Sequence, residues 1–380
     1  MTPLILFGAL IALAALMQVS HVYTLQEIIG APNLTRLVTD VKAMPKFQMD
    51  PQLLVVTRKV EGNTASVKKV QGQRGLVRIS RHGAPSRLRG QDGIAAQSIT
   101  LLNAAEHQIH DMTTLLNLQS TDSDTKQKMG MQEIARQTKS FGRRFENTRR
   151  AAVLCALSFG KLWFNEDGEL LVTSTDAVVT VDFGVSADHK DQCGALISAS
   201  WAIAGTDIRG DISSLKRQSV QDTGQELAYA YYGKDVPKHF AVNTEIGTEI
   251  AGSPMLSQAM FSQEIPDGFQ SLKWRPVGDS FFVDEDGTVQ EAFDADKIVF
   301  TPEVNTDWYD FIEGSNIVPS ALSKLYDDAT GAVAGIKEAH GRYSYARIME
   351  DPVVLKQVAG DCMLPMLNNG DAIFIADVKF

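Results

Sequence analysis

The sequence has little cysteine, and what it has is scattered. Its 380 residues include three cysteines, Cys155, Cys193 and Cys362, and none of them belongs to a C-x-x-C pair. Zinc ribbons and disulfide frameworks need cysteines at recurring short spacings, so neither is expected. We predict three free, buried thiols in a reducing compartment.

The motifs of nucleotide and hydrolase chemistry are also lacking. No G-x-x-x-x-G-K-[ST], G-x-G-x-x-G or G-x-S-x-G occurs in the chain. The acidic segments 165–168 and 284–287 lack EF-hand spacing, so we interpret them as turns. His107 and His110 would lie near each other on a helix, which is a weak metal-site signal beside the alternative of a polar surface. The sequence therefore predicts no enzyme and no cofactor.

Charge is missing from the first residues, where no Asp, Glu, Lys or Arg precedes Glu27. The apolar run 3–17 is shorter than the roughly 20 residues of a membrane span. A signal peptide would begin with Lys or Arg, and this segment has neither. We expect residues 1–23 to form an apolar helix that is buried or covered by a partner, without stable membrane association. A membrane anchor and an uncleaved export signal remain alternatives.

Charge elsewhere is plentiful and unevenly distributed. The net charge is -10, but residues 1–160 hold 20 Lys/Arg against 11 Asp/Glu, and the remainder is strongly acidic. Acidic residues are densest between 266 and 314, with twelve Asp/Glu and three Lys/Arg. Such a division fits ordinary solvated faces, and it also fits a chain whose copies complement one another.

The basic residues are concentrated in segment 58–89, which holds nine Lys/Arg and one acid, Glu61. Two β-biased runs, "ASVKKV" and "LVRIS", flank the Gly-rich "QGQRG" and predict a hairpin. The hairpin has too few apolar residues to build a core, and an isolated hairpin is marginally stable in water. We therefore expect an extended arm that is held by another, acidic surface.

The rest of the chain mixes helices and strands. Apolar residues spaced by three and four predict a long helix over about 129–159, ended by Gly160, with Arg136, Arg143 and Arg150 on another face. A second helix is expected from a cap at Thr206 or Asp207 to Gly224. "WFNEDGELLVT" and "SFFVDEDGTVQEAF" predict hairpins. "VVTVDFG", "SASWA", "ELAYAYYG", "KIVFTPE" and the last forty residues predict strands. Without regular β-α alternation, the pattern favours an α+β fold.

Four segments carry a resemblance to a known family. They are "GQRGLVRISRHGAPSRL", "RRFENTRRAAVLCALSFGKLWFNEDGELL", "VTVDFGVSADHKDQCGALISASWAIAGTDIRGDI" and "DPVVLKQVAGDCMLPMLNNGDAIFIADV". In this order they resemble the extended loop, spine helix, V-D-x-G strand with its following helix, and closing strands of the lambda-type major capsid proteins of tailed bacteriophages. The resemblance covers most of residues 50–380, whereas residues 1–24 depart from the pattern.

The resemblance implies the α+β Hong Kong 97 capsid fold. We expect an N-terminal arm with the apolar helix (1–50), an extended hairpin loop (51–97), and a peripheral domain with the spine helix (98–205). An axial domain (206–335), returning peripheral strands (336–366) and a final axial strand (367–380) follow.

The implied function is a major capsid protein that self-assembles into the icosahedral shell around the double-stranded DNA of a tailed phage. The implied partners are further copies in hexamers and pentamers, a separate scaffolding protein, the portal and non-specifically bound DNA, with a decoration protein left open. The protein would be assembled in the host cytoplasm and reside in the virion. An encapsulin-like compartment and a membrane-anchored protein using residues 1–23 are the alternatives.

Within this scheme the basic arm would contact the acidic half of a neighbouring copy. The expected assembly contacts are Arg58, Lys68, Lys69, Arg74, Arg78, Arg81, Arg87 and Arg89 on the arm, and Asp284, Glu285 and Asp286 on the receiving surface. Some members of this fold link a loop lysine covalently to a neighbour's asparagine, which would involve Lys68 or Lys69; simple electrostatic docking is the alternative.

Overall fold

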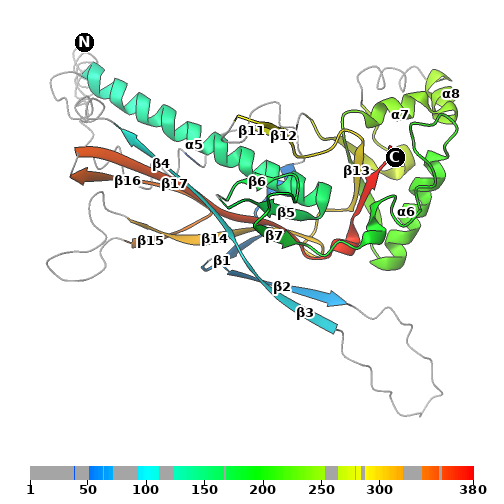
Figure 1. The fold of residues 1–380 in the computed structure, drawn as a ribbon, viewed down its shortest axis with the longest axis horizontal. Helices are drawn as coiled ribbons and strands as arrows, with labels where there is room; N and C mark the ends of the chain where they lie inside the picture. Colours follow the sequence, from blue (N-terminus) through cyan, green and yellow to red (C-terminus); the bar gives the residue numbers. More distant parts are fainter. Residues whose placement is uncertain are drawn as a thin grey trace, which may run out of the picture. The chain divides into compact units, whose positions relative to one another are not determined.

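The computed structural model describes residue 38 and residues 51–62, 64–71, 93–110, 124–166, 168–252, 264–278, 280–283, 287–319, 336–350 and 353–380. The chain divides into two compact units. Unit 1 comprises Met1–Val41, Ala105–Gly142 and Ile317–Gly360, and unit 2 comprises Lys42–Ala104, Arg143–Asn316 and Asp361–Phe380. The elements are drawn in Figure 1.

The largest sheet has six strands, in the order β1-β14-β17-β16, with β15 paired to β14 and β4 paired to β17. The strands are β1 (Arg58–Val60), β4 (Leu102–His110), β14 (Tyr309–Pro319), β15 (Ile336–His340), β16 (Arg342–Glu350) and β17 (Val353–Leu367). Strands β16 and β17 are separated by Asp351-Pro352, where the sequence predicts a turn. The strand-rich C-terminal region is therefore confirmed.

Unit 1 contains a buried polar network instead of a purely apolar interior. Gln357 on β17 donates to Thr138 Oγ1 (2.8 Å) and to Ser344 Oγ (3.3 Å). The Nε2 of His110, on β4, lies 3.0 Å from Gln357 Oε1. Because buried polar groups are costly unless they are paired, this network defines how the strands and the helix of unit 1 fit together.

The long helix α5 (Asp124–Phe159) confirms the predicted spine helix and begins about five residues earlier than expected. Its predicted apolar face is buried at Ile134, Phe141, Phe145, Ala152 and Cys155. It ends before Gly160, whose φ of +65° favours glycine. A Cβ there would also lie 2.7 Å from Val185 Cγ2, so both backbone conformation and space require glycine.

In unit 2 the helix is followed by a small sheet in the order β6-β5-β7, made of β5 (Lys161–Phe164), β6 (Leu170–Leu171) and β7 (Val179–Asp182). The predicted hairpin at 165–168 connects β5 to β6. Strands β2 (Thr64–Gln71) and β3 (Gly93–Thr100) form a separate antiparallel ladder, drawn side by side in Figure 1.

A five-stranded sheet in the order β10-β9-β13-β18-β8 has apolar side chains on both faces. It contains β8 (Lys190–Asp191), β9 (Leu227–Tyr232), β10 (Lys273–Pro276), β13 (Lys297–Pro302) and β18 (Phe374–Asp377). Along β9, Tyr229 and Tyr231 belong to one buried cluster, while Ala230 and Tyr232 belong to another. The sheet therefore separates two cores, as alternation along a strand with two covered faces requires.

Helices α6 (Ile208–Asp222), α7 (Val236–Val242) and α8 (Thr244–Gly252) lie together beside this sheet (Figure 1). The predicted cap of α6 is confirmed, since Asp207 Oδ1 accepts from the Gly210 N–H at 2.8 Å. Single-turn 3-10 segments occur at Pro51–Leu54, Ala187–His189, Phe269–Ser271 and Gly370–Ala372. Mixed helices and strands without regular alternation confirm the α+β class.

Three local predictions are wrong. The partner of β2 is β3, with Thr64 opposite Thr100 and Gln71 opposite Gly93, and not the run 76–80, which lies outside the described residues. Ala65 of β2 and Ile99 of β3 are opposite each other and buried in the same core, which holds β3 beside β2.

The segment that contains His107 and His110 is strand β4, not a helix. Its residues alternate between partly buried and exposed, with His107 exposed and His110 buried. Residues three apart on a strand point to opposite faces, so the two imidazoles cannot bind one metal ion. Pairing within the six-stranded sheet here overrides the helix preference of Ala, Glu and Gln.

The predicted strand "SASWA" is an irregular turn. Trp201 is fully buried in it, with its backbone N–H donating to Val378 O at 2.8 Å and its Nε1 donating to Asp211 Oδ2 at 2.9 Å. These tertiary contacts, and not a strand ladder, hold the backbone in place.

Candidate assembly surfaces and the interior that supports them

Only part of the expected assembly contacts falls within the described residues. Arg58 lies on β1, which pairs in parallel with β14, and its Nη2 is 4.0 Å from Asp310 Oδ2 of the same chain. Lys68 and Lys69 lie on β2, opposite Ala96 and Ala95, and their side chains are outside the described part. Also outside are Arg74, Arg78, Arg81, Arg87, Arg89, Asp284, Glu285 and Asp286.

The base of the β2–β3 ladder is firmly attached to unit 2. Ala65 and Ile99, directly opposite each other, are buried in the main apolar cluster. Just before β2, the Gly62 N–H donates to Ser315 Oγ (2.7 Å) and Gly62 O accepts from the Ser315 N–H (3.3 Å). The arm therefore starts from a fixed point in the core.

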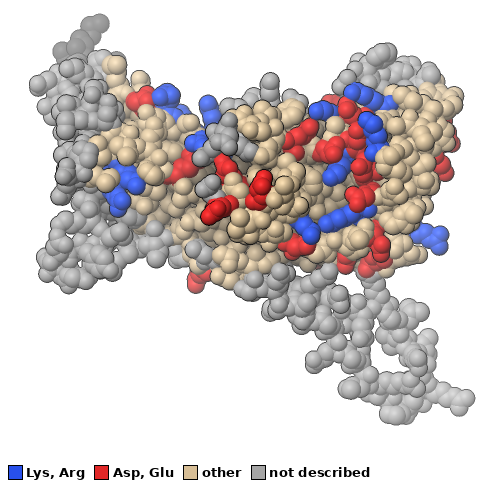
Figure 2. All heavy atoms as spheres, viewed as in Figure 1, with Lys and Arg blue, Asp and Glu red and all other residues tan. Residues whose placement is uncertain are grey.

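Many carboxylates of the acidic region 266–314 have partners within the chain. Asp267 pairs with Arg275 at 3.0 Å, Glu291 with Lys234 at 3.1 Å, and Asp296 with Lys379 at 3.2 Å. On the face drawn in Figure 2, acidic and basic side chains are interspersed among the described residues. The acidic region is thus partly neutralised by its own chain.

A buried cluster of three charged residues, which sequence reasoning missed, lies where α5 meets β14 and β17. Arg149 of α5 makes a bidentate contact with Asp361 of β17, with Nε–Oδ2 and Nη2–Oδ1 distances of 2.5 and 2.7 Å. Its Nη2 also donates to Glu313 Oε1 of β14 at 2.7 Å, and its guanidinium lies 5.3 Å from the ring centroid of Phe311. All three charged residues are buried.

Because the cluster holds two carboxylates for one guanidinium, its cation cannot be removed without leaving buried negative charge. Burial lowers the pKa of Arg149, but the hydrogen bonds and charges of Asp361 and Glu313 raise it more, so the net direction is upward. The cluster connects α5 to the centre of the six-stranded sheet. The sequence signal for a buried partner was weak: Arg149 and Arg150 directly precede the apolar helix end "AAVLCAL".

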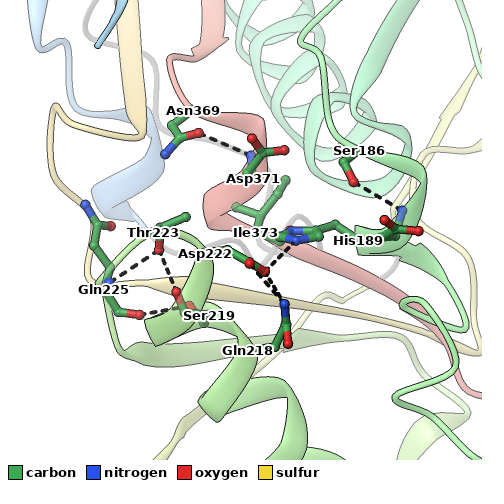
Figure 3. Close-up of polar contacts among 11 residues, drawn as sticks. Ser186, His189, Gln218, Ser219, Asp222, Thr223, Gln225, Asn369, Asp371 and Ile373 are labelled. Carbon is green, nitrogen blue, oxygen red and sulfur yellow. Dashed lines mark hydrogen bonds and ion pairs between the residues drawn. The ribbon is translucent and has the colours of Figure 1, made fainter. Parts of the chain in front are cut away.

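A second buried junction connects the 3-10 segment Ala187–His189 with the end of α6 and the start of β18 (Figure 3). His189 Nδ1 is 3.1 Å from Ile373 O, its Nε2 is 3.1 Å from Asp222 Oδ2, and its ring stacks on Phe374 with centroids 4.1 Å apart. A carbonyl and an ionised carboxylate only accept, so the ring donates to both when both nitrogens carry hydrogen.

Two surface hollows lie at the ends of helices. The larger, about 570 Å³, is lined by residues that include Asp207 and Asn243, whose side chains cap α6 and α8. The other, about 300 Å³, lies at the end of α5, where Lys190 Nζ donates to Phe159 O at 3.1 Å. The last turn of α5 has no basic residue of its own, so Lys190 supplies the positive charge that a helix C-terminus favours.

Within the ranges described, no group of His, Cys, Asp and Glu side chains could hold a metal ion. Burial raises the pKa of the Cys155 and Cys193 thiols to about 12. Burial also raises the pKa of Cys362. All three cysteines are free and buried, as predicted. No helix in the described part of the chain is both long and apolar enough to cross a membrane; residues 1–23 lie outside that part.

The described residues thus form two apolar cores, a buried ion-pair cluster and a two-stranded ladder that is anchored at its base. The family model for phage major capsid protein E matches residues 30–318. The chain belongs to this family; it is a phage major capsid protein that forms the capsid shell and is part of the virion.

Solved structures are similar to this chain at low sequence identity. A phage-related protein from Bordetella bronchiseptica has 9% identity and a TM-score of 0.47, with 92% of this chain and 97% of that chain covered. A putative prophage capsid protein from E. coli CFT073 has 14% identity and a TM-score of 0.46, with coverages of 92% and 93%.

The SrpI encapsulin complex from Synechococcus elongatus has 9% identity and a TM-score of 0.42, with coverages of 89% and 90%. Because these TM-scores are below 0.5, the similarities carry no argument about function. No curated protein matches the chain in sequence.

Proposed function

We propose that copies of this capsid protein are held in register by the basic arm of one copy, residues 58–89, lying across acidic residues of a neighbour. The observation that carries the proposal is the segregation of charge: nine Lys/Arg and one acid in the arm, against twelve acids and three Lys/Arg in 266–314. One exposed ion pair contributes only about 0–1 kcal/mol, but a repeated set determines register and partner choice.

The described part of the arm supports this proposal. Strands β2 and β3 pair with each other and, within the described residues, with no third strand. Their base is buried in the core at Ala65 and Ile99. A two-stranded ladder gains little stability alone, so contact with another copy would stabilise the part beyond its base.

Ion pairs within the chain reduce the number of carboxylates that are available to receive the arm of a neighbour. Asp267, Glu291, Asp296 and Glu313 already contact basic residues of their own copy. The segment that joins β11 to β12 in the sequence contains Asp284, Glu285 and Asp286 in succession, and we favour it as the acidic target. Arg58, beside Asp310 of its own chain, would act at the base of the arm.

The finer features of the role are part of the same proposal. Copies would assemble as hexamers and pentamers, with a separate scaffolding protein, the portal and, as an additional component, a decoration protein. DNA would be enclosed without specific recognition, since an acidic chain opposes tight binding to phosphates. The chain would have no enzymatic activity, and the expected arm, loop, peripheral and axial boundaries would describe its domains.

Charge reversal with rescue tests the arm contact. Changing Arg74, Arg78 and Arg81 to Glu should reduce the fraction of protein that sediments as particles at least tenfold. Changing Asp284, Glu285 and Asp286 to Lys in the same chain should restore most of it, because the two sets would attract again. Both variants are compared with wild type in cells that also supply the neighbouring phage genes.

A matched control is Arg136→Glu together with Arg143→Glu, which alters exposed arginines of α5 outside the arm. This control should assemble more fully than the arm variant. Assembly of the arm variant at wild-type yield, or absence of rescue despite normal folding of both single sets, would refute the arm contact without affecting the shell role.

A further inference from the structure

The hairpin of β11 (Phe281–Val283) and β12 (Val289–Glu291) carries apolar side chains on both of its faces. Phe281 lies opposite Glu291, Phe282 opposite Gln290, and Val283 opposite Val289. Residues directly opposite each other share a face, as do residues two apart on a strand. The inner face therefore holds Phe282 and Gln290, and the outer face holds Phe281, Val283, Val289 and Glu291.

The inner face is explained by its own chain. Phe282 packs against the main apolar cluster of unit 2. Gln290 Oε1 accepts from the Val172 N–H at 3.3 Å, beside the end of β6. These two contacts determine which face of the hairpin points inward.

The residues that the structure describes leave the outer face largely exposed. Val283 and Val289 are 64% and 61% exposed, and Phe281 is 40% exposed. An antiparallel sheet with one face on the core usually carries polar residues on the other. Here Glu291 is the polar residue among the described members of the face, and Lys234 lies beside it, with its Nζ 5.2 Å from the Phe281 ring centroid and 3.1 Å from Glu291 Oε1.

We propose that the outer face of the β11–β12 hairpin is an apolar contact surface that a second copy of this chain covers in the assembled shell. The proposal rests on the shell-forming role, because a shell places further copies of the same chain against each subunit. It differs from the arm contact in chemistry: the arm contact is ionic, and this contact depends on burying apolar side chains.

The charge around the hairpin favours a second copy over DNA as the occupant. The segment that joins the two strands contains Asp284, Glu285 and Asp286, and Glu291 lies on the outer face itself. Phosphates would be repelled by these carboxylates. A copy of this chain provides both apolar surface and, in residues 58–89, an excess of positive charge.

Thiol protection tests whether the face becomes covered. Val289→Cys introduces an exposed thiol, while the three native thiols are buried and react poorly. A maleimide should label Val289→Cys rapidly in unassembled protein and at least tenfold more slowly in purified shells from which the other phage proteins have been removed. Equal labelling in both states would overturn the proposal, as would protection found only while a scaffolding protein is present.

A conservative substitution tests whether burial of this face drives assembly. The double variant Val283→Thr/Val289→Thr keeps side-chain shape and β-branching but replaces two methyl groups by hydroxyls. Its particle fraction should fall about tenfold, with little response to salt, while its urea midpoint as unassembled protein stays unchanged. The matched control is Val242→Thr on α7, where an equally exposed valine (57%) receives the same change.

Wild-type assembly by the double variant would overturn the proposal. Failure of the shell role and failure of this inference give different results. If wild-type protein forms no particles under any condition, the shell role itself is refuted. If intact particles form and the maleimide still labels the thiol of Val289→Cys rapidly, only the hairpin contact is refuted.

Discussion

The Arg149 cluster and the outer face of the β11–β12 hairpin depart from the usual distribution of residues in opposite directions. The cluster places three charges in the interior of unit 2, and the hairpin places three large apolar side chains on its surface. Each charge of the cluster contacts an opposite charge of the same chain, at 2.5–2.7 Å. The apolar side chains on the outer face of the hairpin stay 40–64% exposed among the described residues.

This difference shows which interactions a single copy completes by itself. Buried ionic groups are tolerated only with partners, so the centre of the sheet must be finished during folding. An exposed apolar face costs little in a monomer and becomes favourable when another surface covers it. The interior therefore serves the stability of the subunit, and the hairpin serves its association.

The largest expected effect comes from breaking the cluster. Arg149→Met should reduce the free energy of unfolding by about 3–5 kcal/mol, because Asp361 and Glu313 would remain buried without their cation. Urea denaturation of unassembled protein measures this loss, and poor soluble yield would be its extreme form.

The control for the cluster is Arg136→Met. Arg136 is exposed and pairs with Glu133 at 2.7 Å on the same helix. Solvent screens this pair, so its loss should leave the urea midpoint close to that of wild type. A similar loss of stability in both variants would mean that the buried cluster has no special role.

The two faces of the hairpin provide the next comparison. Phe282→Ala should lower the free energy of unfolding by about 2–3 kcal/mol, since a partly buried ring packed on the core is removed. Phe281→Ala, on the outer face, should change stability much less and assembly much more. Urea midpoints measure the stability of both variants, and sedimenting fractions measure their assembly. If the two variants lost equal stability and equal assembly, Phe282 and Phe281 would not lie on an inner and an outer face.

A smaller effect is expected at the His189 junction. His189→Phe keeps an aromatic ring beside Phe374 but removes the donors that reach Ile373 O and Asp222. The Ile373 carbonyl would lose this hydrogen bond, whereas Asp222 is exposed and still accepts from Gln218, so the carbonyl accounts for an expected loss of about 1–2 kcal/mol in the free energy of unfolding. His107→Phe, at an exposed position of β4, is the matched control and should be nearly silent in the same urea titration.

The smallest expected signal concerns the thiols. Burial raises the pKa of Cys155 and Cys193 to about 12, so at pH 8 the reactive thiolate is scarce in the folded protein. Iodoacetamide should label native protein negligibly and modify three cysteines after unfolding in guanidinium, as read by mass spectrometry. Rapid labelling of folded protein would contradict the buried placement on which the maleimide test depends.

Local patterns in the sequence predicted many elements correctly. The spacing of four, three and four through Phe141, Phe145, Thr148 and Ala152 identified α5. The cap at Asp207 located the start of α6. Predictions failed where a distant contact overrode local preference. The helix-favouring residues around His107 form β4 because the strand joins a sheet, and Trp201 lies in a turn because Val378 and Asp211 hold it.

The sequence by itself determined the periodic elements, the free cysteines and the division between a basic first part and an acidic remainder, because these properties depend on residues close together in the chain or on composition alone. Only the tertiary structure decided that Arg149 would meet Asp361, 212 residues away, and that one face of the β11–β12 hairpin would point outward. Both outcomes depend on how distant strands pack, and short-range spacing contains no information about that packing.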